Sequence, residues 1–132
     1  MFYSRNVVSN TLLYERPADS MDAFSQSLAE MRTAQRRFAA AGVQARVAML
    51  AAFADRLEAE KTKLARMICE EVGRCLRECE AEMDKSVSLI RYYVKLAPQL
   101  LQHQTIATQA SLSQVRFEPL GVVLAVMPWN YP

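Results

Sequence analysis

The chain has 132 residues, which is enough for one domain with a single hydrophobic core. Hydrophobic residues make up 52% of it, too large a share for a disordered tail. The net charge of +2, from 16 basic and 14 acidic residues, does not provide the strongly basic surface that binds DNA, RNA or an anionic membrane. We therefore expect a folded domain with no nucleic-acid and no membrane partner.

The sequence also bears on location. It contains no run of the roughly 18 apolar residues that a membrane-spanning helix needs, and residues 1–5 lack the apolar stretch of a signal peptide. Its three cysteines (Cys69, Cys75 and Cys79) are odd in number and clustered, which argues against a disulfide scaffold. These features predict a cytoplasmic protein.

The first forty residues predict a hairpin and then a helix. Residues 6–14 favour a short strand-turn-strand, with Val7-Val8 and Leu12-Leu13 on either side of Ser9-Asn10. Either Asp19 or Ser20 can cap the following helix. Apolar residues then recur at steps of three and four, as on one face of a helix, at Met21, Phe24, Leu28, Met31, Ala34 and Phe38.

Three further helical segments follow. Gly42 is expected to end the first helix, and the apolar rhythm resumes over residues 43–57 and again over 64–72, where Gly73 ends it. A last helix is predicted over 76–94. It should end before Pro98, because proline disfavours helical geometry in the residue ahead of it.

After Pro98 the pattern changes to that of strands. Residues 105–108 and 113–117 alternate polar and apolar side chains. Residues 122–127 are six consecutive apolar residues, typical of a strand buried on both faces in a parallel sheet. Ligands of such sheets bind beyond the carboxyl ends of the strands, so we expect a functional site to begin at Pro128.

The spacing of the cysteines bears on metal binding. Cys75 and Cys79 are four residues apart and, with Cys69 or His103, could face a metal ion. Structural zinc usually requires four ligands with tighter paired spacings, so we favour helix packing for the cysteines and predict no metal.

Glycines bear on phosphate binding. The three in the chain are too far apart for a Gly-rich phosphate loop, and they stand at Gly42, Gly73 and Gly121. Any loop that cradles a nucleotide phosphate must therefore lie elsewhere.

One segment is distinctive. Residues 117–132 read Phe-Glu-Pro-Leu-Gly-Val-Val-Leu-Ala-Val-Met-Pro-Trp-Asn-Tyr-Pro and resemble the aldehyde dehydrogenase family, whose pattern is Pro-Leu-Gly-Val-Val, an apolar strand and Pro-Trp-Asn-aromatic-Pro. Residues 71–74, followed by Glu78, Glu82 and Lys85, are similar to the family's Glu-x-Gly-Lys helix end and the acidic helix after it. The family's Lys-Pro is Arg74-Cys75 here.

This resemblance implies an α/β fold that is incomplete in these residues. Residues 1–104 would be the N-terminal helical part of a Rossmann-like cofactor-binding domain, and 105–118 an oligomerisation-type β-hairpin. Residues 119–132 would contribute its first buried core strand and the Pro-Trp-Asn motif. The intact parent would be a homo-oligomer.

The resemblance also implies roles for individual residues. Asn130 would stabilise the oxyanion that forms when a cysteine thiolate attacks an aldehyde. The cofactor, NAD or NADP, would lie against Val126, Met127, Pro128 and Trp129. The reaction would be the oxidation of a small aldehyde to its carboxylic acid. Residues 118–130 most resemble semialdehyde dehydrogenases, among which succinate semialdehyde is the commonest substrate.

The family places its nucleophilic cysteine and general-base glutamate downstream of Asn130. The 132-residue chain alone is therefore predicted to be inactive, since without a nucleophile no covalent intermediate forms. An alternative of another class is a stand-alone helical protein-interaction module, built as an up-and-down bundle over residues 20–97.

Overall fold

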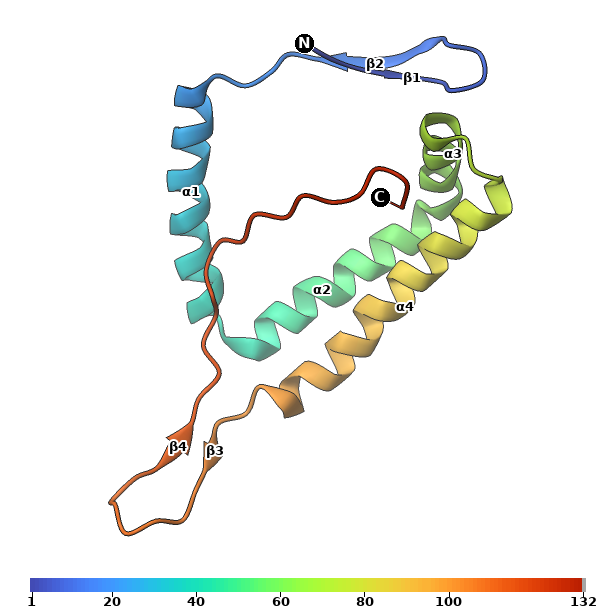
Figure 1. The fold of residues 1–132 in the computed structure, drawn as a ribbon. Helices are drawn as coiled ribbons and strands as arrows, with labels where there is room; N and C mark the ends of the chain where they lie inside the picture. The colour runs from blue at the N-terminus through green and yellow to red at the C-terminus, as the bar shows by residue number, and fades with distance from the viewer. Residues whose placement is uncertain (132) are drawn as a thin grey trace.

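The computed structural model describes residues 1–131, so Pro132, the last residue of the Pro-Trp-Asn segment, lies outside the described residues. Two small hairpins flank four helices (Figure 1). The elements in chain order are β1 (Phe2–Arg5), β2 (Leu12–Arg16), α1 (Met21–Ala40), α2 (Gly42–Ala59), α3 (Lys61–Val72), α4 (Leu76–Leu100), β3 (Gln104–Thr105) and β4 (Gln114–Val115).

The N-terminal hairpin is confirmed, but its first strand lies earlier than expected. β1 pairs antiparallel with β2, with Phe2 opposite Arg16. Val7 and Val8 lie in the turn instead of in a strand. The reason is local, because the Asn6 side-chain oxygen accepts hydrogen bonds from the backbone N–H groups of Val8 and Ser9, and this favours a turn over a strand.

α1 begins directly after Ser20, one of the two residues that the sequence offered as its N-terminal cap. The Ser20 hydroxyl accepts a hydrogen bond from the Ala23 N–H at 3.1 Å, which satisfies one of the unpaired donors of the first turn. Ala41 separates α1 from α2, and Gly42, the first residue of α2, has a φ of +81°. No residue of α1 is buried, so this helix stands apart from the others in a way that an up-and-down bundle over 20–97 does not allow. That part of the alternative prediction is wrong.

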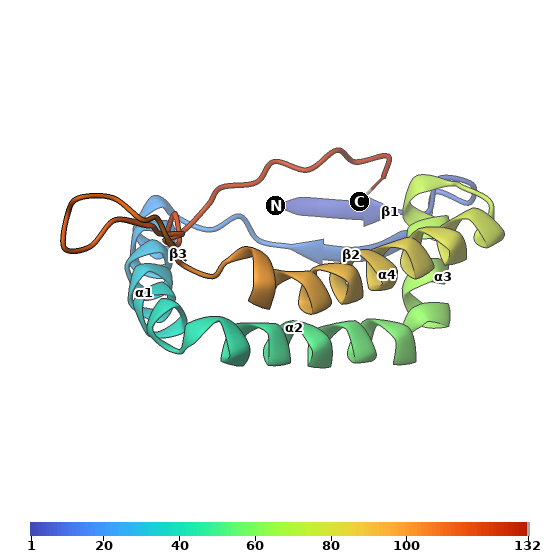
Figure 2. The ribbon, with the colours of Figure 1, turned by 90° about the horizontal axis from the view of Figure 1, so that it is seen from below.

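Helices α2, α3 and α4 hold the core. α2 and α4 run antiparallel side by side, and α3 connects the end of α2 to the start of α4 (Figures 1 and 2). The buried centre consists of Ala65, Cys79 and Met83, and the partly buried side chains around it are Leu57, Leu64, Ile68 and Cys69. This small core fixes the corner between α3 and α4, on which the functional site depends.

Gly73 ends α3, as predicted, and joins the helices to the first hairpin. Its φ of +79° is left-handed, which glycine adopts without penalty. A Cβ at this position would lie 2.6 Å from Cγ2 of Val7. The Val7 N–H also donates to the Glu70 carbonyl at 3.2 Å. The turn of the hairpin therefore packs directly against the end of α3.

The predicted end of α4 is wrong. The helix continues through Pro98 to Leu100, and the Leu101 N–H still donates to the Ala97 carbonyl. Pro98 stands in the last turn, where its missing N–H costs a single main-chain hydrogen bond and no further turn of helix depends on it.

The second hairpin is confirmed, although its paired region is shorter than the alternating pattern suggested. Gln104 pairs with Val115 and Thr105 with Gln114. Beyond these pairs, the Ile106 N–H donates to the Ser113 carbonyl at 2.8 Å. The remainder of 105–118 is irregular.

The prediction of a buried strand over residues 122–127 is also wrong for these residues. The segment pairs with no strand within residues 1–131 and is exposed, with Leu124 at 85% and Val126 at 88%. A strand buried on both faces requires neighbouring strands and a covering layer, and residues 1–131 supply neither. The chain exposes 10746 Å² of surface, whereas a compact monomer of 14.9 kDa exposes about 7,000 Å².

No single helix in residues 1–131 is long and apolar enough to cross a membrane. α1 and α2 reach that length and hydropathy only when they are counted together across the 113° bend that separates them.

Candidate functional site

The C-terminal segment brings the Pro-Trp-Asn residues to the helical core. Residues 117–131 run from the corner between α1 and α2 towards the corner between α3 and α4 (Figures 1 and 2). Near its start the segment borders a hollow of about 310 Å³ lined by Phe38, Arg46, Leu101 and Phe117, among others. At its other end Trp129 and Asn130 form a turn.

Asn130 is exposed in this turn. A side-chain amide carries two N–H donors, which is the chemistry that an oxyanion site requires. Trp129 beside it is 82% exposed, so the turn presents its groups outward.

Val126, Met127, Pro128 and Trp129 form the predicted cofactor-contacting run. Val126 is 88% exposed and Met127 70%, so their apolar surfaces and backbone are accessible. They fit the apolar contacts of a nicotinamide cofactor. They do not fit its phosphates, for which this stretch offers neither a cation nor a helix N-terminus.

A cluster of charged and aromatic side chains lies next to this turn, and the sequence did not predict that its members meet. Arg74, just before α4, donates from Nη1 to Oε2 of Glu82, and its Nε lies 3.7 Å from Oε2 of Glu78. The hydrogen bond to Glu82 raises the pKa of Arg74 above its ordinary value. The Arg74 Cζ atom also lies 5.2 Å from the centre of the Tyr131 ring.

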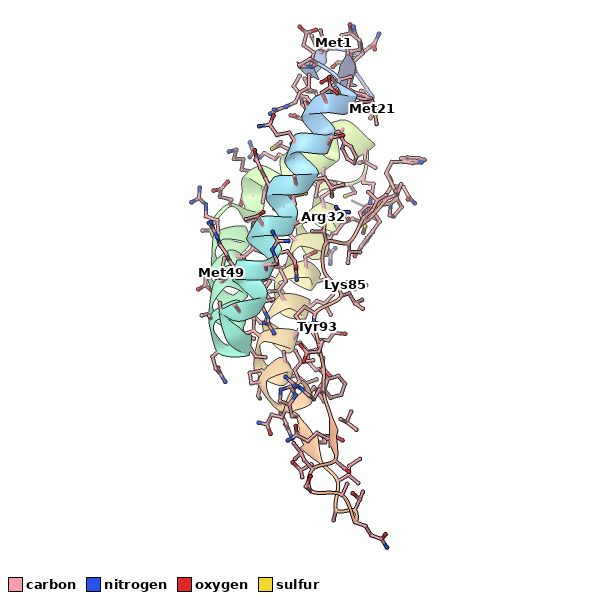
Figure 3. All side chains as sticks on the ribbon, turned by 90° about the vertical axis from the view of Figure 1, so that its left-hand side faces the viewer. Met1, Met21, Arg32, Met49, Lys85 and Tyr93 are labelled. Carbon is pink, nitrogen blue, oxygen red and sulfur yellow. The ribbon has the colours of Figure 1, made fainter. Side chains whose placement is uncertain are left out.

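A second cation faces the same ring. The Lys85 Nζ atom lies 5.7 Å from the centre of the Tyr131 ring. Lys85 is on α4, on the side along which the C-terminal segment runs (Figure 3). Similarity to a family helix was the only sequence signal for four of its members, Arg74, Glu78, Glu82 and Lys85. No sequence pattern placed them beside Tyr131, because they lie far from it along the chain.

The cysteines lie close to this corner but have different environments. Cys79 is fully buried, Cys69 is half-buried and Cys75 is exposed. Burial raises the pKa of the Cys79 thiol, which disfavours the nucleophilic thiolate. Among residues 1–131 no group of three or more His, Cys, Asp or Glu side chains is arranged to hold a metal ion.

With this geometry the chain can be compared with known proteins. It belongs to the aldehyde dehydrogenase family, whose sequence model matches residues 2–132. A succinate-semialdehyde dehydrogenase [NADP(+)] of Mycobacterium avium is 44% identical over 84 residues, which are 61% of this chain and 18% of that protein. The succinate semialdehyde dehydrogenase [NAD(P)+] Sad of Escherichia coli is 33% identical over 76 residues, 58% of this chain and 16% of that protein. This chain thus spans less than a fifth of these relatives' length.

Solved structures agree with the fold. An NADP-dependent glyceraldehyde-3-phosphate dehydrogenase of Bacillus halodurans, complexed with NADP, superposes with a TM-score of 0.90 at 28% identity, over 98% of this chain and 29% of that one. A betaine aldehyde dehydrogenase of Staphylococcus aureus in complex with NAD+ gives a TM-score of 0.90 at 23% identity, over 99% of this chain and 27% of that one. The helices and hairpins thus have the arrangement found in aldehyde dehydrogenases.

Proposed function

We propose that this chain forms the first part of the cofactor-binding domain of an NAD(P)-dependent aldehyde dehydrogenase that oxidises succinate semialdehyde to its acid. The observation that carries the proposal is the exposed Pro128-Trp129-Asn130 turn at the end of an apolar segment, in a chain of this family. The relatives named as succinate-semialdehyde dehydrogenases support the choice of substrate.

Asn130 is assigned to the chemical step. Attack of a thiolate on the aldehyde carbon places negative charge on the former carbonyl oxygen, and the Asn130 amide N–H stabilises that charge. Loss of one such donor typically lowers kcat about 10²- to 10³-fold. Val126 to Trp129 would hold the cofactor by apolar and backbone contacts, and the bound cofactor would supply the hydride acceptor.

Residues 1–132 are proposed to be inactive by themselves. None of the three cysteines stands where the family's nucleophile does, downstream of Asn130, and Cys79 is buried in the helical core. The proposed division remains a helical part over 1–104, an oligomerisation hairpin over 105–118 and the core strand with its motif over 119–132. The strand would form when further strands of the domain pair with it.

We also propose a cytoplasmic location and a homo-oligomeric parent. The three cysteines are all unpaired, which suits a reducing compartment. The hairpin over 105–118 projects away from the helices and has the exposed edges that pairing between subunits requires (Figure 1).

The test is a chimera in which residues 1–131 replace the matching segment of the Mycobacterium avium enzyme. We expect NADPH to form on addition of succinate semialdehyde, and Asn130→Ala to lower kcat about 10²- to 10³-fold. The chain alone should form no NADPH. A correctly folded chimera in which Asn130→Ala leaves kcat unchanged would remove Asn130 from the mechanism. A stand-alone interaction module would instead give a cooperatively melting chain that confers no activity on the chimera.

A further inference from the structure

Tyr131 is the least exposed of the large apolar side chains that follow Val122. Its exposed fraction is 43%, whereas that of Trp129 is 82% and that of Val126 is 88%. The Tyr131 ring is thus more covered by the rest of the protein than the side chains of Trp129 and Val126 before it. Because Tyr131 directly follows Asn130, whatever holds this ring also limits the movement of the Asn130 amide.

Two cations face the Tyr131 ring. The Arg74 Cζ atom and the Lys85 Nζ atom lie 5.2 Å and 5.7 Å from its centre. Cations within about 6 Å of an aromatic centre are attracted by the negative face of the ring. Arg74 lies just before α4 and Lys85 lies on α4, so both cations that face the ring are positioned by this helix and the turn before it.

Arg74 is itself held in place. Its guanidinium donates to Glu82, a residue that is only 3% exposed. Its Nε faces Glu78, which lies one turn before Glu82 on α4. The planar guanidinium can pair with a carboxylate at its edge and stack on an aromatic ring with its face, which an ammonium cannot do. Oε1 of Glu82 is buried and accepts no hydrogen bond within the described residues. The buried negative charge of Glu82 is therefore balanced by Arg74 at Oε2.

We propose that Arg74 and Lys85 are positioning residues that act through the Tyr131 ring to hold the Asn130 turn against α4. Glu82 fixes Arg74, Arg74 and Lys85 fix the ring, and the ring fixes the backbone next to Asn130. The inference rests on the proposed function only for what Asn130 does. The fixing of the turn is a property of the chain itself.

The chain contains its own probe for this arrangement. Trp129 is the only tryptophan and lies two residues from Tyr131. Time-resolved anisotropy of Trp129, measured in the full chain at dilutions at which light scattering shows no association, reports how freely the turn moves. An exposed cation–π contact of ordinary strength changes an equilibrium by about two- to fivefold, so losing one should raise the detached fraction of the turn by that factor.

Two pairs of variants make the test specific. Tyr131→Leu removes the ring and should increase the fast anisotropy decay, whereas Tyr131→Phe keeps the ring and should restore the slow decay. Lys85→Met removes one exposed cation and should have the smaller of the two effects. Lys95→Met removes a lysine elsewhere on α4 and should change nothing. Circular dichroism verifies that the helices persist.

The proposal is overturned if Tyr131→Leu and Lys85→Met both leave the Trp129 anisotropy unchanged, or if Lys95→Met changes it as much as Lys85→Met does. This readout does not depend on activity. A turn that is held by the ring in an inactive chimera would leave this inference standing and contradict the proposed function.

Discussion

The buried carboxylate of Glu82 accepts a hydrogen bond from the guanidinium of Arg74, a residue that precedes the helix on which Glu82 lies. The pair connects the turn after Gly73 with the second turn of α4. It is the most buried ion pair in the described chain and stands beside the proposed Asn130 site.

Removal of one partner of this ion pair should lower the melting temperature more than removal of both partners. Arg74→Met leaves the Glu82 carboxylate buried without a partner, and an uncompensated buried charge is strongly destabilising. The double variant Arg74→Met/Glu82→Met replaces the pair with apolar side chains of similar volume. We expect the melting temperature to fall in the single variant and to recover in the double variant. Equal melting temperatures in the two would contradict this account.

Gly73→Ala should destabilise the chain by about 1–3 kcal/mol, the usual cost of a left-handed conformation in a residue with a side chain. The added Cβ would also lie 2.6 Å from Cγ2 of Val7. Gly42→Ala is the matched control, because Gly42 has a similar φ of +81° but no atom within 4 Å of the added Cβ. Urea unfolding should therefore show the larger loss at Gly73, and Val7→Ala should reduce it.

The three thiols should react at different rates. Cys75 is exposed and should be modified first by a thiol reagent, followed by the half-buried Cys69. Cys79 is fully buried and its pKa is raised by burial, so it should react only as fast as the core opens. Cys75→Ser should remove the fast phase alone. A fast phase that persists in this variant would contradict the assignment of that phase to Cys75.

Glu60 should make the stability of the chain depend on pH in the acidic range. The Arg56 Nε atom donates to Oε1 of Glu60 at 2.6 Å, and this hydrogen bond lowers the pKa of Glu60 below its ordinary value of 4.5. A carboxyl group whose pKa is lower in the folded state than in the unfolded state stabilises the fold. Its contribution to the free energy of unfolding is complete above the ordinary pKa and is lost as the pH falls through the lowered pKa. Wild type should melt slightly above Glu60→Gln at neutral pH, and the difference should vanish in acid.

The exposed apolar segment should make the isolated chain associate. Leu124 and Val126 are almost fully exposed, on an extended segment whose backbone has no strand partner within residues 1–131. Such segments favour association between chains. The double variant Leu124→Glu/Val126→Glu should reduce light scattering without changing the helical circular dichroism. The same changes on α1, at Met21 and Met31, are the control.

Several features of the fold could be predicted from the sequence because neighbouring residues decide them. Ser20 caps α1 through the Ala23 N–H only three residues away, and Gly73 ends α3 through its own left-handed φ. The first hairpin was predicted from its turn residues, although the Asn6 side chain places Val7 and Val8 in the turn. The strands of the second were predicted from their alternating polar and apolar side chains. The family match of residues 2–132 likewise agrees with a motif read directly from 117–132.

Other features depend on residues distant in the chain, and no local pattern contains them. Residues 122–127 have the composition of a buried strand, but a strand forms only when partners pair with its backbone, so here they remain extended and exposed. The attachment of Tyr131 to Arg74 and Lys85 exists only because α3 and α4 pack around Cys79 and bring that corner to the end of the chain. The sequence by itself determined the family, the helices and the identity of Asn130 as the candidate oxyanion donor. Only the tertiary structure decided what lies beside that residue, because cation–π contacts and buried ion pairs depend on distances in space.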